Sequence, residues 1–542
     1  MPELSEAAFG PDLERRSVLD RAHRGDIEGA FGRLRTFDVD GRSGRRRLAA
    51  LLAVAGPGVV VMVADNDAGS LATFAQAGQD YGLRLAWLVL GLGAVLFVTQ
   101  EMAARLGVVT GAGHARLIYE RFGRRWGNFA LWDLAVLNLF TLITELIGLE
   151  LGLGYFGINR ALALPAGAVV LLATTATGSF RRWEQAMYVL VAGSLIALPL
   201  AVILHFGGLS VATHPSPVIP KYLDKSGVLF ALALIGTTLA PWQLFLQQSN
   251  VVDKRITTRW LRYERLDTLI GAVLYTALAL AVLIGCGTLL QHAGLHGQFA
   301  SAGSVATELR RYAGYSAGAL FAVVLIDGSL LGAAAVNLAT SYAIGDAVGH
   351  RHSLHRRWTD ARFFYASYSA LLGAAAVVVL LLGQSVGAFT LVIQALSAVL
   401  FPSAAVLLLL LCNDRAVLGP HVNSRWLNVV GGGVVGLILV LSALLTVQTA
   451  LPHLRWWVAP SVVVALGLAG AGALIWPSRR SGRPSRGTVR AKDVGWSMPP
   501  LETLPPPERS RSRGVALAGL RIYLLVSGTT LVIEALRYVR GG

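Results

Sequence analysis

Long apolar stretches recur along most of this chain, with short polar segments between them. Each stretch is close to the roughly 20 residues that an α-helix needs to cross a hydrocarbon layer of about 30 Å. Strands of a membrane barrel would alternate apolar and polar residues, and these stretches do not. The pattern predicts an all-α polytopic membrane protein, with spans near residues 48–78, 84–108, 127–152, 161–177, 185–206, 227–252, 266–290, 316–346, 363–383, 387–411, 426–449 and 456–476.

Composition and charge agree with a membrane protein. Of the 542 residues, 54% are hydrophobic and only 14% are charged, whereas about a quarter of the residues of a soluble domain are charged. The formal net charge of +16 comes largely from Arg residues in alternate connections between spans, as the positive-inside rule describes. We therefore expect a multi-pass protein of a bacterial cytoplasmic (inner) membrane, with a cytoplasmic N-terminus and no nucleic-acid partner.

The polar segments indicate how the rest of the chain is organised. Residues 1–47 are predicted to form a cytoplasmic N-terminal region without a signal-peptide pattern. Residues 477–513 are rich in Pro, Ser and Arg, which is typical of a disordered cytoplasmic linker. Residues 514–542 contain a final apolar stretch, predicted as an additional hydrophobic helix that either spans the membrane or lies at its surface. The two cysteines, Cys286 and Cys412, imply neither a disulfide framework nor a cysteine metal cluster.

The first span contains an unusual polar motif. The stretch "MVADNDAGSLATFAQAG" places Asp65, Asn66 and Asp67 inside the membrane. A carboxylate in hydrocarbon costs about 3 kcal/mol on insertion scales and usually marks an ion or substrate pathway. Gly69 and its small neighbours favour a break in the helix. A carboxylate beside unpaired backbone carbonyls would form an oxygen site for a cation.

A second interruption follows five spans later, in "LIGTTLAPWQLFLQQSNVVDK". Pro241 removes a backbone hydrogen bond and frees a carbonyl one turn earlier, near Thr237. Alone, Asp67 could simply cap a helix and Pro241 could simply kink one. Two interrupted spans at this spacing instead favour two five-helix repeats of inverted topology, with a binding site near the middle of the membrane.

Both motifs resemble those of Nramp divalent-metal transporters. The segment "GPGVVVMVADNDAGSLATFAQAGQDYGLRLAW" is similar to the first helix of that family, whose signature there is Asp-Pro-Gly-Asn. The segment "APWQLFLQQSNVVDK" falls where the family has Met-Pro-His-Asn. Within the superfamily, "ADNDAG" and "GTTLAPW" look most like the Nramp-related magnesium transporters. The resemblance implies a LeuT-type fold: a ten-helix core over residues 48–411 with helices 1 and 6 broken, then helices 11 and 12 over 426–476.

The resemblance also implies site residues. The metal site it implies comprises Asp67, Ser70 at the position of the family's Asn, the carbonyls of Ala64 and Thr237, Ala240 at the position of the family's ligand Met, and Gln394. The candidates for the pathway or its gates are Asp65, Asn66, Gly69, Glu145, Pro241, Trp242, Gln243 and Gln247.

Departures from the family pattern concern the choice of ion. A thioether helps to select manganese and iron, and Ala240 has none. Ala240 and Ser70 also shorten the groups around Asp67, which predicts a wider cavity. Mg²⁺ gives up its waters reluctantly, so we expect a largely hydrated Mg²⁺, and also Mn²⁺, as the transported ion, with no further cofactor.

Other departures concern proton coupling. Trp242, which cannot titrate, replaces the family's His, and Leu142 replaces an acidic residue one turn before Glu145. We therefore expect uptake that is not proton-coupled, driven by the membrane potential. The alternatives are a proton-coupled Mn²⁺/Fe²⁺ transporter, a secondary transporter of a small cationic organic solute such as an amino acid, a non-transporting sensor, and an efflux protein.

Nothing in the sequence indicates an enzyme. It shows no Gly-rich phosphate loop with its Lys and no nucleophile–base arrangement. The expected partners are the divalent ion and the lipid bilayer, with the protein functional as a monomer. Glu101 and Arg105, four residues apart at the end of the second span, are interpreted as an ion pair on the helix surface, with a gate as the alternative.

Overall fold

The computed structural model describes residues 25–35, 38, 43–206, 225–291, 293–381, 387–450, 496–506, 513–514 and 516–524. The α-helices of these ranges are α2 (Gly44–Val54), α3 (Pro57–Val63), α4 (Ala68–Tyr81), α5 (Ala86–Thr110), α6 (His114–Phe122), α7 (Arg124–Tyr155), α8 (Arg160–Thr175), α9 (Phe180–Ser194), α10 (Ala197–Phe206), α11 (Lys225–Gly236), α12 (Pro241–Asp253), α13 (Leu261–Leu289), α14 (Ala302–Ala313), α15 (Tyr315–Val348), α16 (Arg362–Leu381), α17 (Gly387–Cys412), α18 (Arg415–Leu418) and α19 (Arg425–Ala450). The 3₁₀ helices are η3 (Gly82–Leu85), η4 (Thr258–Trp260), η5 (Gly419–His421) and η6 (Leu501–Thr503). The strands β1 (Ile27–Glu28) and β2 (Arg33–Leu34) form an antiparallel hairpin that pairs Ile27 with Leu34.

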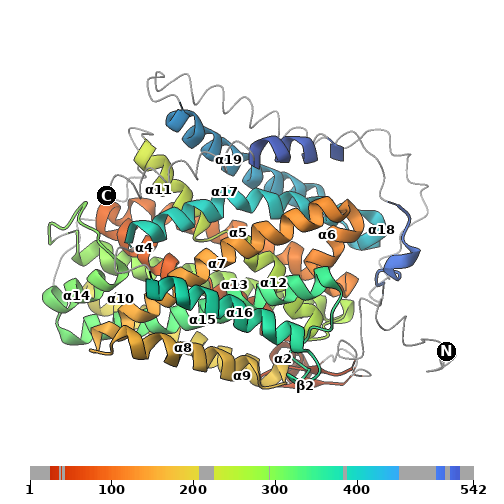
Figure 1. The fold of residues 1–542 in the computed structure, drawn as a ribbon, viewed down its shortest axis with the longest axis horizontal. Coiled ribbons are helices and arrows are strands. Elements are labelled where there is room, and N and C mark those ends of the chain that lie inside the picture. Colours follow the sequence, from red (N-terminus) through yellow and green to blue (C-terminus); the bar gives the residue numbers. More distant parts are fainter. Residues whose placement is uncertain are drawn as a thin grey trace.

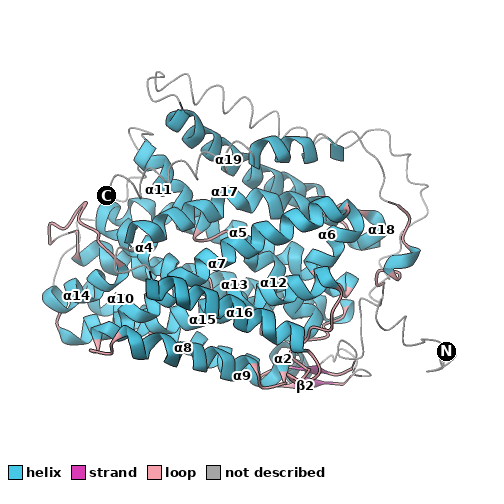
Figure 2. Ribbon diagram, in the orientation of Figure 1, coloured by secondary structure: helices cyan, strands magenta, loops and turns pink. Residues whose placement is uncertain are grey.

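The helices form one bundle. Figure 1 shows α7, α13 and α15 in its middle, with α8 and α9 along one edge and α17 and α19 along the other. Figure 2 shows that helix dominates the described chain and that strand is confined to the small hairpin. Nine of the described helices are long and apolar enough to cross a membrane, or up to ten if the bent pair α2 and α3 counts as one span. Buried apolar side chains join them into one large cluster. The all-α polytopic fold predicted from the sequence is therefore confirmed.

Connections that the charge pattern assigned to one side of the membrane meet at one end of the bundle. The Gln248 amide, near the end of α12, donates to the Ala112 carbonyl between α5 and α6 (2.7 Å). The Asp253 carboxylate, at the end of α12, accepts from the backbone N–H of Leu354 between α15 and α16 (2.9 Å). Figure 1 shows α6 and α18 at this end and α10 and α14 at the opposite end. The α5–α6 connection, the end of α12 and the α15–α16 connection therefore lie at the same end of the bundle.

The first span has a break that the sequence did not reveal. It was expected to run without interruption from residue 48 to the Asp65–Asp67 motif, but α2 and α3 meet at an angle of 49°. Gly56 lies between them with φ of 152°, in a region that favours glycine, and Pro57 begins α3. A Cβ on Gly56 would overlap the Glu184 carboxylate. The bend thus results from local backbone chemistry and from a close tertiary neighbour.

A buried ion pair fastens this bend to the N-terminal hairpin. The Lys254 ammonium contacts Glu184 Oε1 (2.6 Å) and donates to the Ala55 carbonyl (2.7 Å). The second oxygen, Glu184 Oε2, accepts from the backbone N–H of Ala30 in the hairpin turn (2.6 Å). Figure 1 shows the hairpin beside α2 and α9. The described part of the predicted N-terminal region is therefore packed against the helix bundle.

The C-terminal predictions are described only in part. The predicted span 456–476 lies outside the described residues, as does most of the predicted linker. Residues 496–506 are described and rest on the bundle, where the Met498 backbone N–H donates to the Val109 carbonyl (3.0 Å). Residues 516–524 are helical, and the Tyr523 hydroxyl donates to the Val399 carbonyl of α17 (2.9 Å).

Candidate metal site between two broken helices

The first helix breaks at the polar motif. Helix α3 ends at Val63 and α4 begins at Ala68. Asp67 is the N-cap of α4, and its carboxylate accepts from the Ser70 backbone N–H (2.8 Å). A carboxylate is favoured at a helix N-terminus by the free N–H groups and the helix dipole. Because an ionised carboxylate can accept about four hydrogen bonds, Asp67 can cap the helix and also bind a cation.

The sixth helix breaks where Pro241 begins α12. Helix α11 ends at Gly236, and Pro241 has no N–H to donate to the carbonyl of Thr237 four residues earlier. Side chains satisfy that carbonyl instead: the hydroxyls of Ser70 and Tyr275 both donate to it, each at 3.2 Å. The Thr237 hydroxyl also donates to the Ser70 hydroxyl (3.2 Å). Both predicted breaks are confirmed, and they contact each other directly.

Two further polar side chains reach the N-terminus of α4. Gln394, from α17, lies so close to Gly69 that a Cβ on this glycine would overlap the Gln394 amide nitrogen. Glu145, from α7, accepts from the Ala68 backbone N–H through Oε2 (3.0 Å). Both side chains are buried. The absence of a side chain at Gly69 is therefore what allows Gln394 to approach the break.

Asp65 belongs to the same centre. Its carboxylate interacts with the Gln243 side chain and lies close enough to Asp67 for mutual repulsion. The Gln243 amide donates to the Thr238 carbonyl (3.3 Å) and accepts from the Gln100 amide (2.9 Å). Gln100, from α5, was not identified from the sequence, because an amide within an apolar span gives no indication of its partner.

Three buried carboxyl groups, those of Asp65, Asp67 and Glu145, lie close together at this centre. Among the described residues, no ion pair joins any of these three groups to an Arg, Lys or His, and backbone N–H groups of α4 donate to Asp67 and Glu145. Asp65 Oδ2, Glu145 Oε1 and the Asn66 side-chain oxygen have no hydrogen-bond partner. Buried carboxylates without a counter-charge are costly. A cation that binds to these oxygens would offset that cost.

The remaining predicted residues lie around or beside this centre. Ala64 is the C-cap of α3, Ala240 is the N-cap of α12, and Trp242 is buried in the first turn of α12. Gln247 is directed elsewhere, because its amide donates to the Glu264 carboxylate (3.1 Å). Among the described residues, no group of three or more His, Cys, Asp or Glu side chains forms a ready metal cage. Ligands would therefore have to include hydroxyl, amide and backbone oxygens.

The two breaks lie close together beside Asp67, where the short side chains predicted a wider cavity. Ser70 and Thr237 hydrogen-bond across the gap between the two breaks. A neighbouring cavity, lined by Ala68 and Thr144 among others, has a volume of about 10 Å³, which is about enough for one water molecule. The short side chain of Ser70 is thus compensated by close approach of the two breaks, which composition alone could not show.

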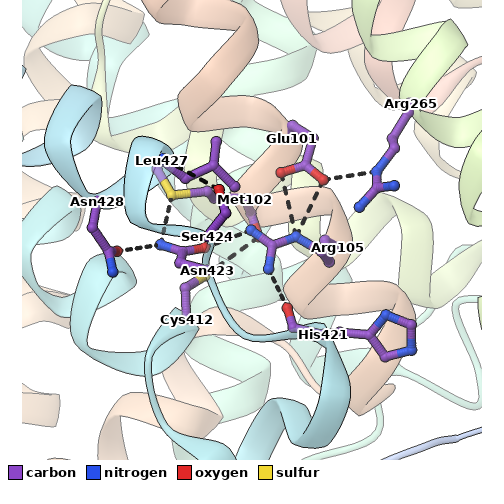
Figure 3. Close-up of polar contacts among 10 residues, drawn as sticks. All are labelled: Glu101, Met102, Arg105, Arg265, Cys412, His421, Asn423, Ser424, Leu427 and Asn428. Carbon is purple, nitrogen blue, oxygen red and sulfur yellow. Dashed lines mark hydrogen bonds and ion pairs between the residues drawn. The ribbon is translucent and has the colours of Figure 1, made fainter. Parts of the chain in front are cut away.

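The interpretation of Glu101 and Arg105 as a surface pair is wrong. Both side chains are buried. Figure 3 shows the Arg105 guanidinium between the Glu101 carboxylate (3.1 Å), the His421 carbonyl and the Asn423 side chain (2.6 Å). Glu101 also contacts Arg265 of α13 (2.8 Å). The cluster ties α5 to α13 and to the connection between α18 and α19, and an i, i+4 spacing could not reveal these distant partners.

Two broken membrane helices that meet at buried carboxylates define the protein class: a polytopic transporter of the LeuT-type fold. Residues 58–448 match the Nramp family, described as natural resistance-associated macrophage protein-like, and the chain belongs to that family.

Relatives and a solved structure agree with this assignment. The chain is 29% identical over 429 residues to a divalent metal cation transporter MntH of Verminephrobacter eiseniae, covering 75% of this chain and 92% of that protein. It is 26% identical over 424 residues to the MntH of Bacillus subtilis, covering 74% and 94%. Its fold is similar to that of the Eremococcus coleocola manganese transporter, with a TM-score of 0.63 and 21% identity over 81% of this chain and 96% of that one. These relatives are named as transporters, not enzymes.

Proposed function

We propose that this protein transports divalent metal cations across a bacterial inner membrane, taking up Mg²⁺ and also Mn²⁺ without proton coupling. One observation carries the proposal: the Asp67 carboxylate, the Ser70 hydroxyl and the Thr237 carbonyl converge where two helix breaks meet. Gln394 approaches the same break. The relatives' names, divalent metal cation transporter and manganese transporter, support a divalent ion as the substrate.

The donor atoms favour a hard cation. The proposed ligands are oxygens, and Ala240 contributes no thioether. Hard ions such as Mg²⁺ and Mn²⁺ prefer carboxylate, carbonyl and water oxygens, whereas softer ions gain from sulfur. The unpartnered oxygens of Asp65, Asn66 and Glu145 could accept hydrogen bonds from the water molecules that Mg²⁺ retains. In the conformation described here the helices would have to separate to admit such a hydrated ion.

The membrane potential is a sufficient driving force for a divalent ion. It is worth about 2.3 kcal/mol per charge at 100 mV, and therefore about 5 kcal/mol for two charges. Trp242 and Leu142 occupy the two positions at which the family resemblance would place titratable groups, and neither side chain can titrate. The predicted cytoplasmic N-terminus places the hairpin end of the bundle on the inside of the cell.

Flux into proteoliposomes tests the proposal. Under an inside-negative potential, the wild-type protein should take up Mg²⁺ and Mn²⁺. The Asp67→Asn variant, which keeps a capping acceptor but lacks the charge, should lose at least nine-tenths of that flux. The control is Asp133→Asn, which alters a carboxylate of α7 that is hydrogen-bonded to Ser403 away from the site. Wild-type flux in Asp67→Asn would contradict the proposed site.

Two further measurements address ion choice and coupling. Ala240→Met should improve Cd²⁺ binding relative to Mg²⁺, because it supplies a soft ligand beside the site. Internal pH should stay constant during Mg²⁺ uptake, whereas stoichiometric acidification would establish the proton-coupled alternative. Competition by arginine or lysine, with no metal flux, would indicate a transporter of cationic organic solutes.

A further inference from the structure

We propose that Tyr275 is a positioning residue for metal binding: its phenol fixes the orientation of the Thr237 carbonyl that faces the ion. The proposal rests on the function proposed above, in which that carbonyl is a ligand. Tyr275 lies in the middle of α13, within the apolar segment "AVLYTALALAV". It is not part of either broken helix.

The Thr237 carbonyl needs an external partner. Pro241 removes its helical donor, so the peptide plane at the end of α11 is not held by the backbone ladder. The Tyr275 hydroxyl lies 3.2 Å from this carbonyl and 2.9 Å from the Thr238 hydroxyl. A carbonyl oxygen has two lone pairs. If Tyr275 occupies one lone pair, the other is available to the Ser70 hydroxyl, as in this structure, or to a bound ion.

The phenol itself is rigidly placed. Tyr275 is fully buried, and its ring packs edge-on against Phe74 of α4, with 6.3 Å between ring centroids. Its hydroxyl is close enough to both Asp65 and Asp67 for electrostatic interaction. Tyr275 therefore bridges α13, the second half of helix 1 and the break of helix 6. The unbroken helix α13 thus holds the break between α11 and α12, where the Thr237 carbonyl has lost its helical hydrogen bond.

A purely structural role would look different. A buried tyrosine needs a hydrogen-bond partner, and the Thr238 hydroxyl could meet that need without involving the ion. In that case removal of the phenol oxygen would lower protein stability but leave ion affinity unchanged. If Tyr275 positions the Thr237 carbonyl, the affinity of the folded protein for the ion must fall while the turnover rate at saturating ion changes little.

Calorimetric titration with Mn²⁺ and proteoliposome uptake of Mn²⁺ would separate these roles. Tyr275→Phe should raise the dissociation constant and the KM about tenfold, the equivalent of one hydrogen bond, with kcat within twofold of wild type. Thr238→Val, which leaves the Thr237 carbonyl in place, should change the dissociation constant less than twofold. The matched control is Tyr365→Phe, which removes a buried phenol hydroxyl that donates to the backbone carbonyl of Arg356, away from the site (2.7 Å).

The outcomes are distinguishable. Unchanged Mn²⁺ affinity in Tyr275→Phe would overturn the positioning role, as would an equal loss in Thr238→Val. If Tyr275→Phe is less stable than the wild type, thermal unfolding with and without Mn²⁺ still separates the two roles. The rise in melting temperature that Mn²⁺ causes becomes smaller only if the variant binds Mn²⁺ more weakly. If instead Asp67→Asn binds and transports Mn²⁺ like the wild type, the proposed function itself fails, whatever Tyr275→Phe does.

Discussion

Replacing Lys254 by Met should destabilise the protein strongly. The ammonium contacts Glu184 Oε1 (2.6 Å) and donates to the Ala55 carbonyl (2.7 Å), and neither the Lys254 nor the Glu184 side chain is more than 1% exposed. Met keeps most of the apolar stem but leaves Glu184 as a buried charge. Breaking a buried pair in this way costs about 3–5 kcal/mol. The carboxylates of Glu264 and Asp267 also interact with Lys254, which favours the upper part of that range.

A double-mutant cycle gives this prediction its control. In Lys254→Met/Glu184→Gln, the amide can still accept from the Ala30 N–H, and no unpaired charge remains at this position. We expect the double variant to recover at least about 2 kcal/mol relative to Lys254→Met, because the cost of a broken pair comes mainly from the orphaned charge.

The assay is unfolding in detergent at neutral pH, by heat and by denaturant. The reasoning would be refuted if Lys254→Met unfolded within about 0.5 kcal/mol of the wild type, which is the usual effect of a surface substitution. It would also be refuted if the double variant showed the sum of the two single losses, because the residues would then be energetically independent.

Three other predictions concern separate parts of the molecule. Gly69→Ala should cost about 1–3 kcal/mol through overpacking and reduce Mn²⁺ affinity, because the new Cβ would overlap the Gln394 amide; unfolding and titration measure the two effects. Burial alone would lower the pKa of His352, but Asp346, 2.9 Å away, raises it to about 9. The pair should therefore stabilise the folded state by about 3 kcal/mol below pH 6.5 and lose this effect as the pH rises through 9, so His352→Gln should differ from wild type at pH 6 but not at pH 10. Arg105→Lys should lower stability by about 2 kcal/mol, because an ammonium cannot reproduce the guanidinium's contacts with several partners, whereas equal melting temperatures would count against that role.

Much of the membrane architecture could be predicted because it depends on properties of single segments. A helix in a bilayer must satisfy its own backbone hydrogen bonds, so apolar length identified most of the long membrane helices, whereas short helices such as α6 and α14 were not predicted. The two breaks at the site were also readable. Pro241 has no N–H whatever its surroundings, and the run from Asp65 to Asp67 is too polar for an ordinary span.

Other features depend on neighbours distant in the chain. The bend at Gly56 needs Glu184 and Lys254 beside it, and the burial of Arg105 needs the connection after α18. The wider cavity expected around Asp67 stays a prediction, because side-chain size at two positions says nothing about how closely the helices approach. Tyr275 gave no local signal of its role, since its partners lie 37 and 38 residues away.

The sequence by itself determined the helical type of most membrane spans and the two interruptions of the site, and it made Asp67, Ser70, Thr237, Glu145 and Gln394 candidates for that site. Only the tertiary structure decided which of these groups touch, and that the Tyr275 hydroxyl contacts the freed Thr237 carbonyl. The physical reason is that apolar length and a missing N–H act within a few residues, whereas charge compensation and hydrogen-bond pairing inside a membrane depend on which helices pack together.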